Sequence, residues 1–124
     1  MTGDVCVLDK IKCDLEKLCS RIELERPSII IGLAQSTRSI STIEKKTINV
    51  FHKNGKVNKY CSLSEIEMNI PKNCIFDVNN KSTQSYCNYS MFTIKSFLLE
   101  RNINTPFIFI HITERDINKL LDLF

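Results

Sequence analysis

Three consecutive isoleucines, Ile29 to Ile31, place the strongest constraint on how this chain folds. Side chains of a β-strand point alternately to the two faces of its sheet, so an unbroken apolar run requires both faces to be covered. Pro27 stands before the run and Gly32 ends it, which favours a short strand over Ser28–Gly32. Such a strand is typical of the centre of an α/β sheet, and here it is expected to turn tightly into a helix.

The segment before this strand has the spacing of an amphipathic helix. Its apolar residues are separated by three, four, three and four positions, which places them on one stripe: Leu8, Ile11, Leu15, Leu18 and Ile22. Pro27 removes a backbone donor and disfavours helical structure at the residue before it, so the helix is expected to end there. The sequence therefore predicts a helix followed directly by a buried strand.

The rest of the chain is expected to continue as alternating helices and strands. Gln35 to Glu44 is predicted to form a helix held by packing, because its Ser, Thr and Ile residues are poor helix formers. The other expected elements are strands over Thr47–His52, Val57–Leu63, Asn73–Val78 and Phe107–Ile112, a turn at Asn54–Gly55, a helical turn over Ser64–Asn69, a helix from Met91 to Arg101 and a last helix capped by Thr113 and Asp116. Helices between strands predict the α/β class, as a three-layer α/β/α sandwich with a small mixed sheet in one domain, residues 1–124.

Composition narrows the classes of function. With 124 residues, of which 43% are hydrophobic, the chain can form one core of ordinary size. Its net charge of +3 is weaker than that of a dedicated nucleic-acid binder. No apolar run approaches the roughly 18 residues of a membrane span, and the N-terminus lacks the pattern of a secretory signal. We therefore expect an intracellular, reducing location, nuclear and cytoplasmic, without membrane association.

The residues that carry chemistry form no known catalytic pattern. The cysteines are expected to be thiols with a structural role, and none forms a C-x-x-C pair: Cys6, Cys13, Cys19, Cys61, Cys74 and Cys87. His52 and His111 fall in or at the end of predicted strands and are interpreted as packed side chains; Cys61 or Cys74 could pair with one of them, although no local pattern indicates it. Because G-x-S-x-G, H-E-x-x-H and phosphate-loop patterns are missing, we expect no enzyme, no metal and no cofactor.

Two segments at the ends of the chain resemble a known family. The first joins Leu8–Ile11, Leu15, Leu18 and Arg26 to Ile29–Gly32, and the second runs from Cys74–Asn80 through Met91–Leu99 and Glu100-Arg101 to Phe107–Arg115. Their order is similar to that of the growth-arrest and DNA-damage-inducible (GADD) stress proteins, with a shortened part between Phe51 and Cys74. The resemblance implies a non-catalytic stress-response adaptor that regulates stress-cascade or cell-cycle kinases by binding them, and it allows a homodimer.

An alternative follows from the superfamily to which GADD proteins belong, which includes the kink-turn RNA-binding ribosomal proteins. Those proteins carry RNA contacts on a turn of the pattern Gly-x-Asn-Glu-x-Thr-Lys, which the segment Gly32–Arg38 matches in part. The candidate RNA contacts are Gly32, Gln35, Thr37 and Arg38, with Lys45 and Lys46 nearby. Ala34 replaces the asparagine and offers neither donor nor acceptor, so the adaptor is preferred to a small RNA-binding protein or ribonucleoprotein subunit. A structural subunit or homo-oligomer without a ligand is the third alternative.

Overall fold

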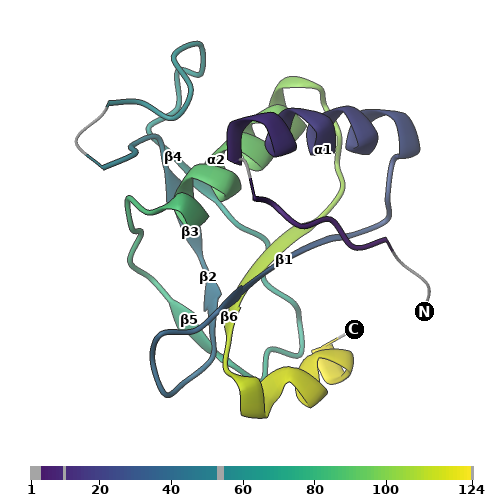
Figure 1. The fold of residues 1–124 in the computed structure, drawn as a ribbon, viewed down its shortest axis with the longest axis vertical. Helices are drawn as coiled ribbons and strands as arrows, with labels where there is room; N and C mark the ends of the chain where they lie inside the picture. Colours follow the sequence, from purple (N-terminus) through teal and green to yellow (C-terminus); the bar gives the residue numbers. More distant parts are fainter. Residues whose placement is uncertain (1–3, 10, 53–54, 124) are drawn as a thin grey trace.

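The computed structural model describes residues 4–9, 11–52 and 55–123 and combines a mixed four-stranded sheet with helices (Figure 1). In chain order the elements are α1 (Ile11–Glu25), β1 (Ile30–Gln35), β2 (Thr42–Glu44), β3 (Lys46–Ile48), β4 (Glu65–Glu67), β5 (Asp77–Asn79), α2 (Tyr86–Glu100), β6 (Phe107–Ile112) and the 3-10 helix η1 (Glu114–Leu123). The four strands lie in the order β1-β6-β2-β5, and β3 pairs with β4 in a separate small sheet. The predicted α/β class with a small mixed sheet is confirmed.

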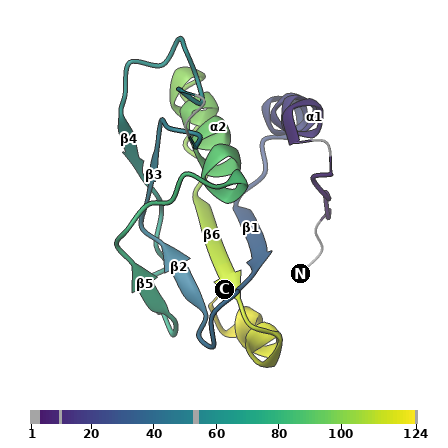
Figure 2. The same cartoon turned by 60° about the vertical axis from the view of Figure 1, so that its left-hand side comes forward.

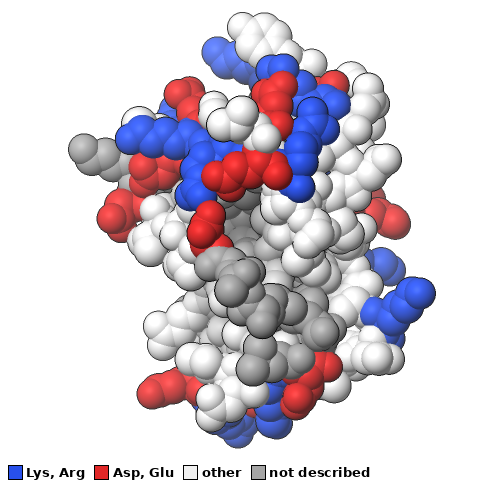
Figure 3. All heavy atoms as spheres, turned by 90° about the vertical axis from the view of Figure 1, so that its right-hand side faces the viewer, with Lys and Arg blue, Asp and Glu red and all other residues white. Residues whose placement is uncertain are grey.

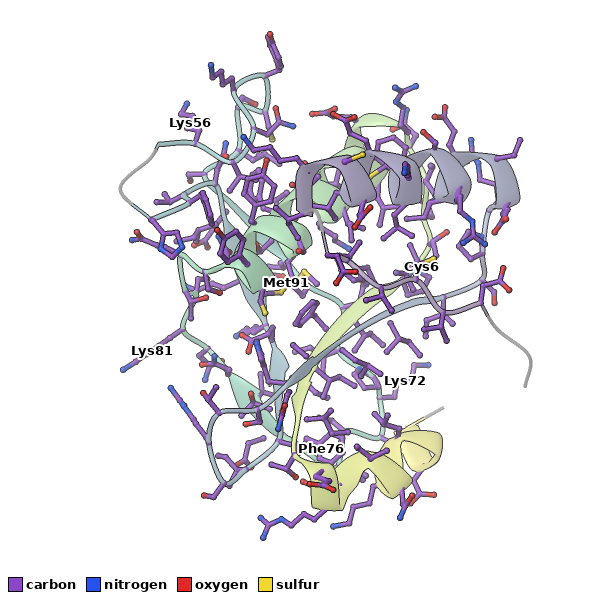
Figure 4. All side chains as sticks on the ribbon, in the orientation of Figure 1. Cys6, Lys56, Lys72, Phe76, Lys81 and Met91 are labelled. Carbon is purple, nitrogen blue, oxygen red and sulfur yellow. The ribbon has the colours of Figure 1, made fainter. Side chains whose placement is uncertain are left out.

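The central strand β6 organises two hydrophobic cores, one on each face of the sheet. Phe107 and Phe109 pack on one face among residues of α1 and α2, and Met91 of α2 lies between that helix and the sheet (Figure 4). Ile108, Ile110 and Ile112 pack on the other face, with Ile43, Phe76 and Leu120 around them. Alternation along the strand places His111 on the face of the phenylalanines, towards α2. Figures 1 and 2 show α1 and α2 together, with η1 at the opposite end of the molecule.

Two elements agree closely with those predicted from the sequence, whereas the strand of the isoleucine run does not lie at the predicted centre of the sheet. Strand β6 has the predicted bounds, and α1 ends before Pro27 as expected. Strand β1, however, pairs only with β6, so it is an edge strand of the described sheet, and it continues through Gly32 to Gln35 without turning there. A Cβ atom at Gly32 would lie 2.3 Å from Cδ2 of Phe109, so packing against that ring explains the glycine.

The helix predicted over Gln35–Glu44 does not form. Ser36 Oγ accepts the N–H of Arg38 at 3.2 Å and donates to the carbonyl of Ile40 at 2.8 Å, which closes a local turn that competes with helix formation. The chain then enters β2, whose Ile43 is fully buried beside β6. The β-branched residues that made a poor helix are therefore used in a strand.

The middle of the chain also departs from the prediction. The strand that pairs with β3 is β4, which lies where a helical turn was predicted, and Val57–Leu63 is irregular. Asn49 holds this loop: its Nδ2 donates to the Asn58 carbonyl at 3.0 Å, and its Oδ1 accepts the Asn58 N–H at 2.9 Å. Of the predicted Asn54–Gly55 turn, Asn54 lies outside the described residues, and Gly55 has a φ of +100°, which favours glycine. One asparagine side chain thus replaces the expected ladder of strand hydrogen bonds.

The surface in Figure 3 carries charges of both signs side by side. Helix α1 contributes acidic and basic residues in turn, and its Arg21 pairs with Asp4 at 2.8 Å and with Glu25 at 3.3 Å. Such mixing gives this face no extended basic patch for a nucleic-acid backbone. Within the part of the chain that the structure describes, no helix has the length and apolar character needed to cross a membrane.

Candidate active site

Three ionisable side chains from three elements are joined by hydrogen bonds. Nδ1 of His111, on β6, lies 2.7 Å from Oε1 of Glu44 at the end of β2. The thiol of Cys87, in the first turn of α2, forms a hydrogen bond with the same imidazole. Because Glu44 occupies Nδ1, Nε2 is the ring nitrogen left for Cys87. A thiol, an imidazole and a carboxylate linked in this order can act as nucleophile, base and orienting group.

The register of the sheet brings the base and the carboxylate together. Thr42 of β2 lies opposite His111 in the antiparallel pairing with β6. Glu44 is two residues further along β2, so its side chain points to the same face as that of Thr42. This is the face that α2 covers, which explains how a helical cysteine reaches a histidine from a strand.

The position of Cys87 in the helix adds a favourable electrostatic environment. Helix α2 begins at Tyr86, so Cys87 is its second residue, and the N-cap residue Ser85 makes no side-chain capping bond. The first backbone N–H groups of a helix have no partner within the helix and carry a partial positive charge. A developing negative charge near Cys87 would therefore face hydrogen-bond donors.

The charge state of His111 is shifted by its two partners. Hydrogen bonds with Cys87 and then with Glu44 raise the pKa of His111 to about 9, against the opposing effect of burial. Glu44 has only 5% of its side chain exposed, whereas His111 has 24% exposed. The imidazole is therefore charged at neutral pH, and one edge of it remains within reach of solvent. An imidazolium beside a cysteine is the reactive arrangement of cysteine nucleophiles.

Asn88, the residue after Cys87, fixes the first turn of α2 to the neighbouring strand. Its Oδ1 accepts Thr47 Oγ1–H at 2.7 Å and the Ile48 N–H at 2.9 Å. Its Nδ2 donates to the carbonyls of Ile48 and Val50, both at 2.9 Å. These bonds use both donors and both acceptor sites of the amide. Asn88 is fully buried, so this anchor sets where Cys87 stands relative to the sheet.

From the sequence, Cys87 and His111 were both interpreted as structural side chains, and Glu44 was not considered. His111 was interpreted as a packed side chain, but it joins Glu44 and Cys87. The cysteines considered as its partners lie elsewhere: Cys61 is buried beside Ile66 and Phe92, and Cys74 donates to the Phe76 carbonyl at 3.0 Å. His52 is exposed and packs its ring against Phe51 at 4.5 Å. A cysteine opening a helix after a polar segment was the available signal for Cys87, whereas Glu44 was hidden inside the mispredicted helix.

The six residues suggested as RNA contacts serve varied local roles. Gly32 makes room for Phe109, and Gln35, Thr37 and Arg38 are exposed at the end of β1 and in the turn after it. Lys45 is exposed, and Lys46 pairs with Glu65 across the small sheet at 3.7 Å. Packing and an ion pair thus account for the two residues that are not freely exposed.

Comparison with known proteins identifies the fold. No protein-family model matches the chain, and no curated protein sequence is similar to it. Among solved structures, pyrrolidone carboxyl peptidase from Thermococcus litoralis superposes with a TM-score of 0.69 at 21% identity, covering 84% of this chain and 57% of that one. A mutant of the Pyrococcus furiosus enzyme gives 0.70 at 16% identity, covering 90% and 65%, and Bacillus amyloliquefaciens pyroglutamyl peptidase I gives 0.62 at 16%, covering 86% and 63%. The fold is that of the pyrrolidone carboxyl peptidases. The chain spans 57% to 65% of the length of these three proteins.

These structural neighbours correct the functional predictions. The resemblance to GADD proteins is wrong, and so are the stress-response adaptor and the expectation of no enzyme, because the matching structures are peptidases. The RNA-binding alternative finds no support among them. The resemblance misled for a physical reason. A helix, a buried strand and a second helix–strand pair occur in many α/β folds, so the matched segments indicated which residues are buried and did not indicate the family. Protein partners and a homodimer stay predictions.

Proposed function

We propose that this chain is a cysteine peptidase that removes a pyroglutamyl (pyrrolidone carboxyl) group from the end of a peptide. The observation that carries the proposal is the connected arrangement of Cys87, His111 and Glu44. It has the order of groups that amide hydrolysis through a covalent intermediate requires. The substrate class comes from the names of the structural neighbours, of which this chain spans less than two thirds.

In the first half of the reaction, the Cys87 thiolate attacks the carbonyl carbon of the pyroglutamyl group. A carbon–sulfur bond forms, and the carbonyl electrons move to oxygen, where the N–H groups at the start of α2 can stabilise the negative charge. The intermediate collapses with cleavage of the carbon–nitrogen bond. The His111 imidazolium gives its proton to the departing amine, which leaves a thioester on Cys87 and a neutral imidazole.

In the second half, water resolves the thioester. Neutral His111 takes a proton from the attacking water, and the oxygen of that water adds to the thioester carbonyl carbon as hydroxide. The carbon–sulfur bond then breaks and releases pyroglutamic acid, so the Cys87 thiolate and the His111 imidazolium are restored. Glu44 accepts the Nδ1–H bond throughout, which keeps Nε2 directed at the sulfur and stabilises the charged ring.

The direct test is hydrolysis of pyroglutamyl p-nitroanilide, followed by the absorbance of released p-nitroaniline. We expect the native chain to release it and Cys87→Ser to lose the activity by about a thousandfold or more. Cys13→Ser is the matched control, because Cys13 is an exposed cysteine on α1, and it should keep native activity. If the native chain is alkylated selectively at Cys87 but releases no p-nitroaniline, the substrate class is wrong and the nucleophile stands.

The same chemistry bears on location. A cysteine nucleophile works only as a reduced thiol, and all six cysteines of the chain are free in the structure. A reducing compartment, the cytoplasm or the nucleus, would keep Cys87 active. Imaging of a tagged chain checks this: an oxidising compartment would contradict it.

A further inference from the structure

The Glu44 carboxylate has a second hydrogen-bond partner, on β5, which flanks β2 on the side away from β6 and His111. Nδ2 of Asn79, on β5, donates to Oε2 of Glu44 at 3.0 Å and lies 3.4 Å from Oε1. Strand β2 lies between β6 and β5, so Glu44 receives His111 from one neighbouring strand and Asn79 from the other. Glu44 and Asn79 are direct partners in the parallel pairing, so the contact is built into the register of the sheet.

The orientation of the Asn79 amide is fixed by its other contacts. Its Oδ1 accepts the backbone N–H of Lys81 at 3.1 Å, so the oxygen must face Lys81 and the NH2 group must face Glu44. The Lys81 side chain itself points away from the molecule (Figure 4), so only its backbone takes part. The Asn79 carbonyl accepts the Lys45 N–H at 3.1 Å, which holds the residue at the end of β5.

A carboxylate in this position needs such a donor. Glu44 is almost completely buried, and the oxygens of a buried carboxylate need hydrogen-bond donors to offset the loss of water. Since His111 is bonded to Oε1 and Asn79 chiefly to Oε2, the two partners divide the carboxylate between them.

We propose that Asn79 is a positioning residue of this site, whose amide holds the Glu44 carboxylate turned towards His111 and thereby aligns the imidazole with Cys87. It touches no reacting atom and acts through Glu44. Its catalytic meaning rests on the proposed function, whereas its effect on His111 can be measured without any substrate.

The test compares Asn79→Leu, which keeps the size of the side chain and removes the donor, with Asn80→Leu, a matched change at the exposed neighbour. The titration of His111 is followed by NMR, and alkylation of Cys87 by iodoacetamide is timed at neutral pH. The titratable groups acting on His111 are Cys87 and Glu44. In Asn79→Leu we expect the pKa of His111 to fall from about 9 towards its ordinary value of 6.5 and alkylation to slow about tenfold. Asn80→Leu should match the native chain.

An unchanged titration of His111 in folded Asn79→Leu would overturn the proposal. If that variant does not fold, Asn79→Ser answers the same question, because its hydroxyl is too short to reach Glu44, and it should lower the pKa of His111 in the same direction. If the variants shift His111 but no form of the chain hydrolyses pyroglutamyl p-nitroanilide, the positioning role stands and the proposed function fails. If hydrolysis occurs and is equally fast in Asn79→Leu, the proposed function stands and the positioning role fails.

Discussion

Two neighbouring residues in the first turn of α2 enter two very different polar networks. Cys87 is half-buried and joins a charged network with His111 and Glu44, which reaches solvent along the imidazole. Asn88 is fully buried and joins a neutral network with Thr47 and the backbone of Ile48 and Val50. Successive residues of a helix point about 100° apart, so one turn can serve both networks.

The difference teaches what each network is suited to do. The neutral network has every donor and acceptor of Asn88 satisfied and no group that changes its charge, so it stabilises the position of the helix. In the proposed reaction, the charged network holds a proton that moves between sulfur, imidazole and substrate. Changes to the neutral network should therefore alter the free energy of unfolding, and changes to the charged network should alter the reactivity of Cys87.

Glu44→Gln should produce the largest effect, and on reactivity. The glutamine NH2 group would face Nδ1 of His111, which must then be an acceptor, so the ring becomes neutral with its one proton on Nε2 and can no longer take a proton from Cys87. Neutralising the orienting carboxylate of such a triad lowers turnover by about ten-thousandfold. We expect a loss of this order in hydrolysis of pyroglutamyl p-nitroanilide, with a much smaller change in the urea midpoint of unfolding. A native rate of Cys87 alkylation in this variant would show that the carboxylate has no orienting role.

Asn88→Ala should produce the next largest effect, and on stability. It leaves the N–H of Ile48 and the carbonyls of Ile48 and Val50 without this partner, while Thr47 Oγ1 keeps the backbone carbonyl of Asn88 at 3.1 Å. Each unsatisfied buried group costs about 1–3 kcal/mol, so a loss of at least about 3 kcal/mol is expected from a total of roughly 5–15 kcal/mol. Urea denaturation measures it, with Asn80→Ala as the control at an exposed asparagine. A loss no greater than that of the control would contradict the anchoring role.

Helices and strands with a strong hydrophobic periodicity could be predicted from the sequence, and those that depend on tertiary contacts could not. Strand β6 and helix α1 were predictable because an apolar run between breakers and a regular helical stripe report burial directly. Strand β2 was not, because Thr42–Glu44 is short and enters the sheet only through pairing with two strands distant in sequence. Propensity offers little guidance for such segments.

The candidate site was less predictable than the fold for a related reason. Its members, Glu44, Cys87 and His111, are separated by 43 and 24 residues, and only the sheet order and the packing of α2 on the sheet bring them together. No local motif links a cysteine at a helix start to a histidine on a strand. His111 was visible as the one polar side chain in an apolar strand, but its partners required the topology.

The charged network should make the free energy of unfolding depend on pH, by an amount between the effects of Asn88→Ala and Thr47→Val. The pKa of His111 is raised in the folded chain to about 9 from an ordinary value of 6.5. The folded state therefore binds the proton more tightly, so this stabilisation is complete below about pH 6.5 and is lost as the pH rises through about 9. We expect a loss on the order of 2 kcal/mol over that window, measured by urea denaturation. His111→Gln should flatten the curve; a native pH dependence in this variant would place the titration elsewhere.

Thr47→Val should produce the smallest effect, and its size tests whether the neutral network is redundant. Valine keeps the shape of the buried threonine and removes the hydroxyl, which donates to Asn88 Oδ1 at 2.7 Å. Oδ1 still accepts the N–H of Ile48 at 2.9 Å, so the amide keeps a partner; the longer contact of the hydroxyl with the Asn88 backbone carbonyl, at 3.1 Å, is lost as well. The expected cost is about 1 kcal/mol by urea denaturation, with no change in the alkylation rate of Cys87. A cost as large as that of Asn88→Ala would mean that the hydroxyl carries the anchor alone, and slower alkylation would show that the two networks are coupled through the first turn of α2.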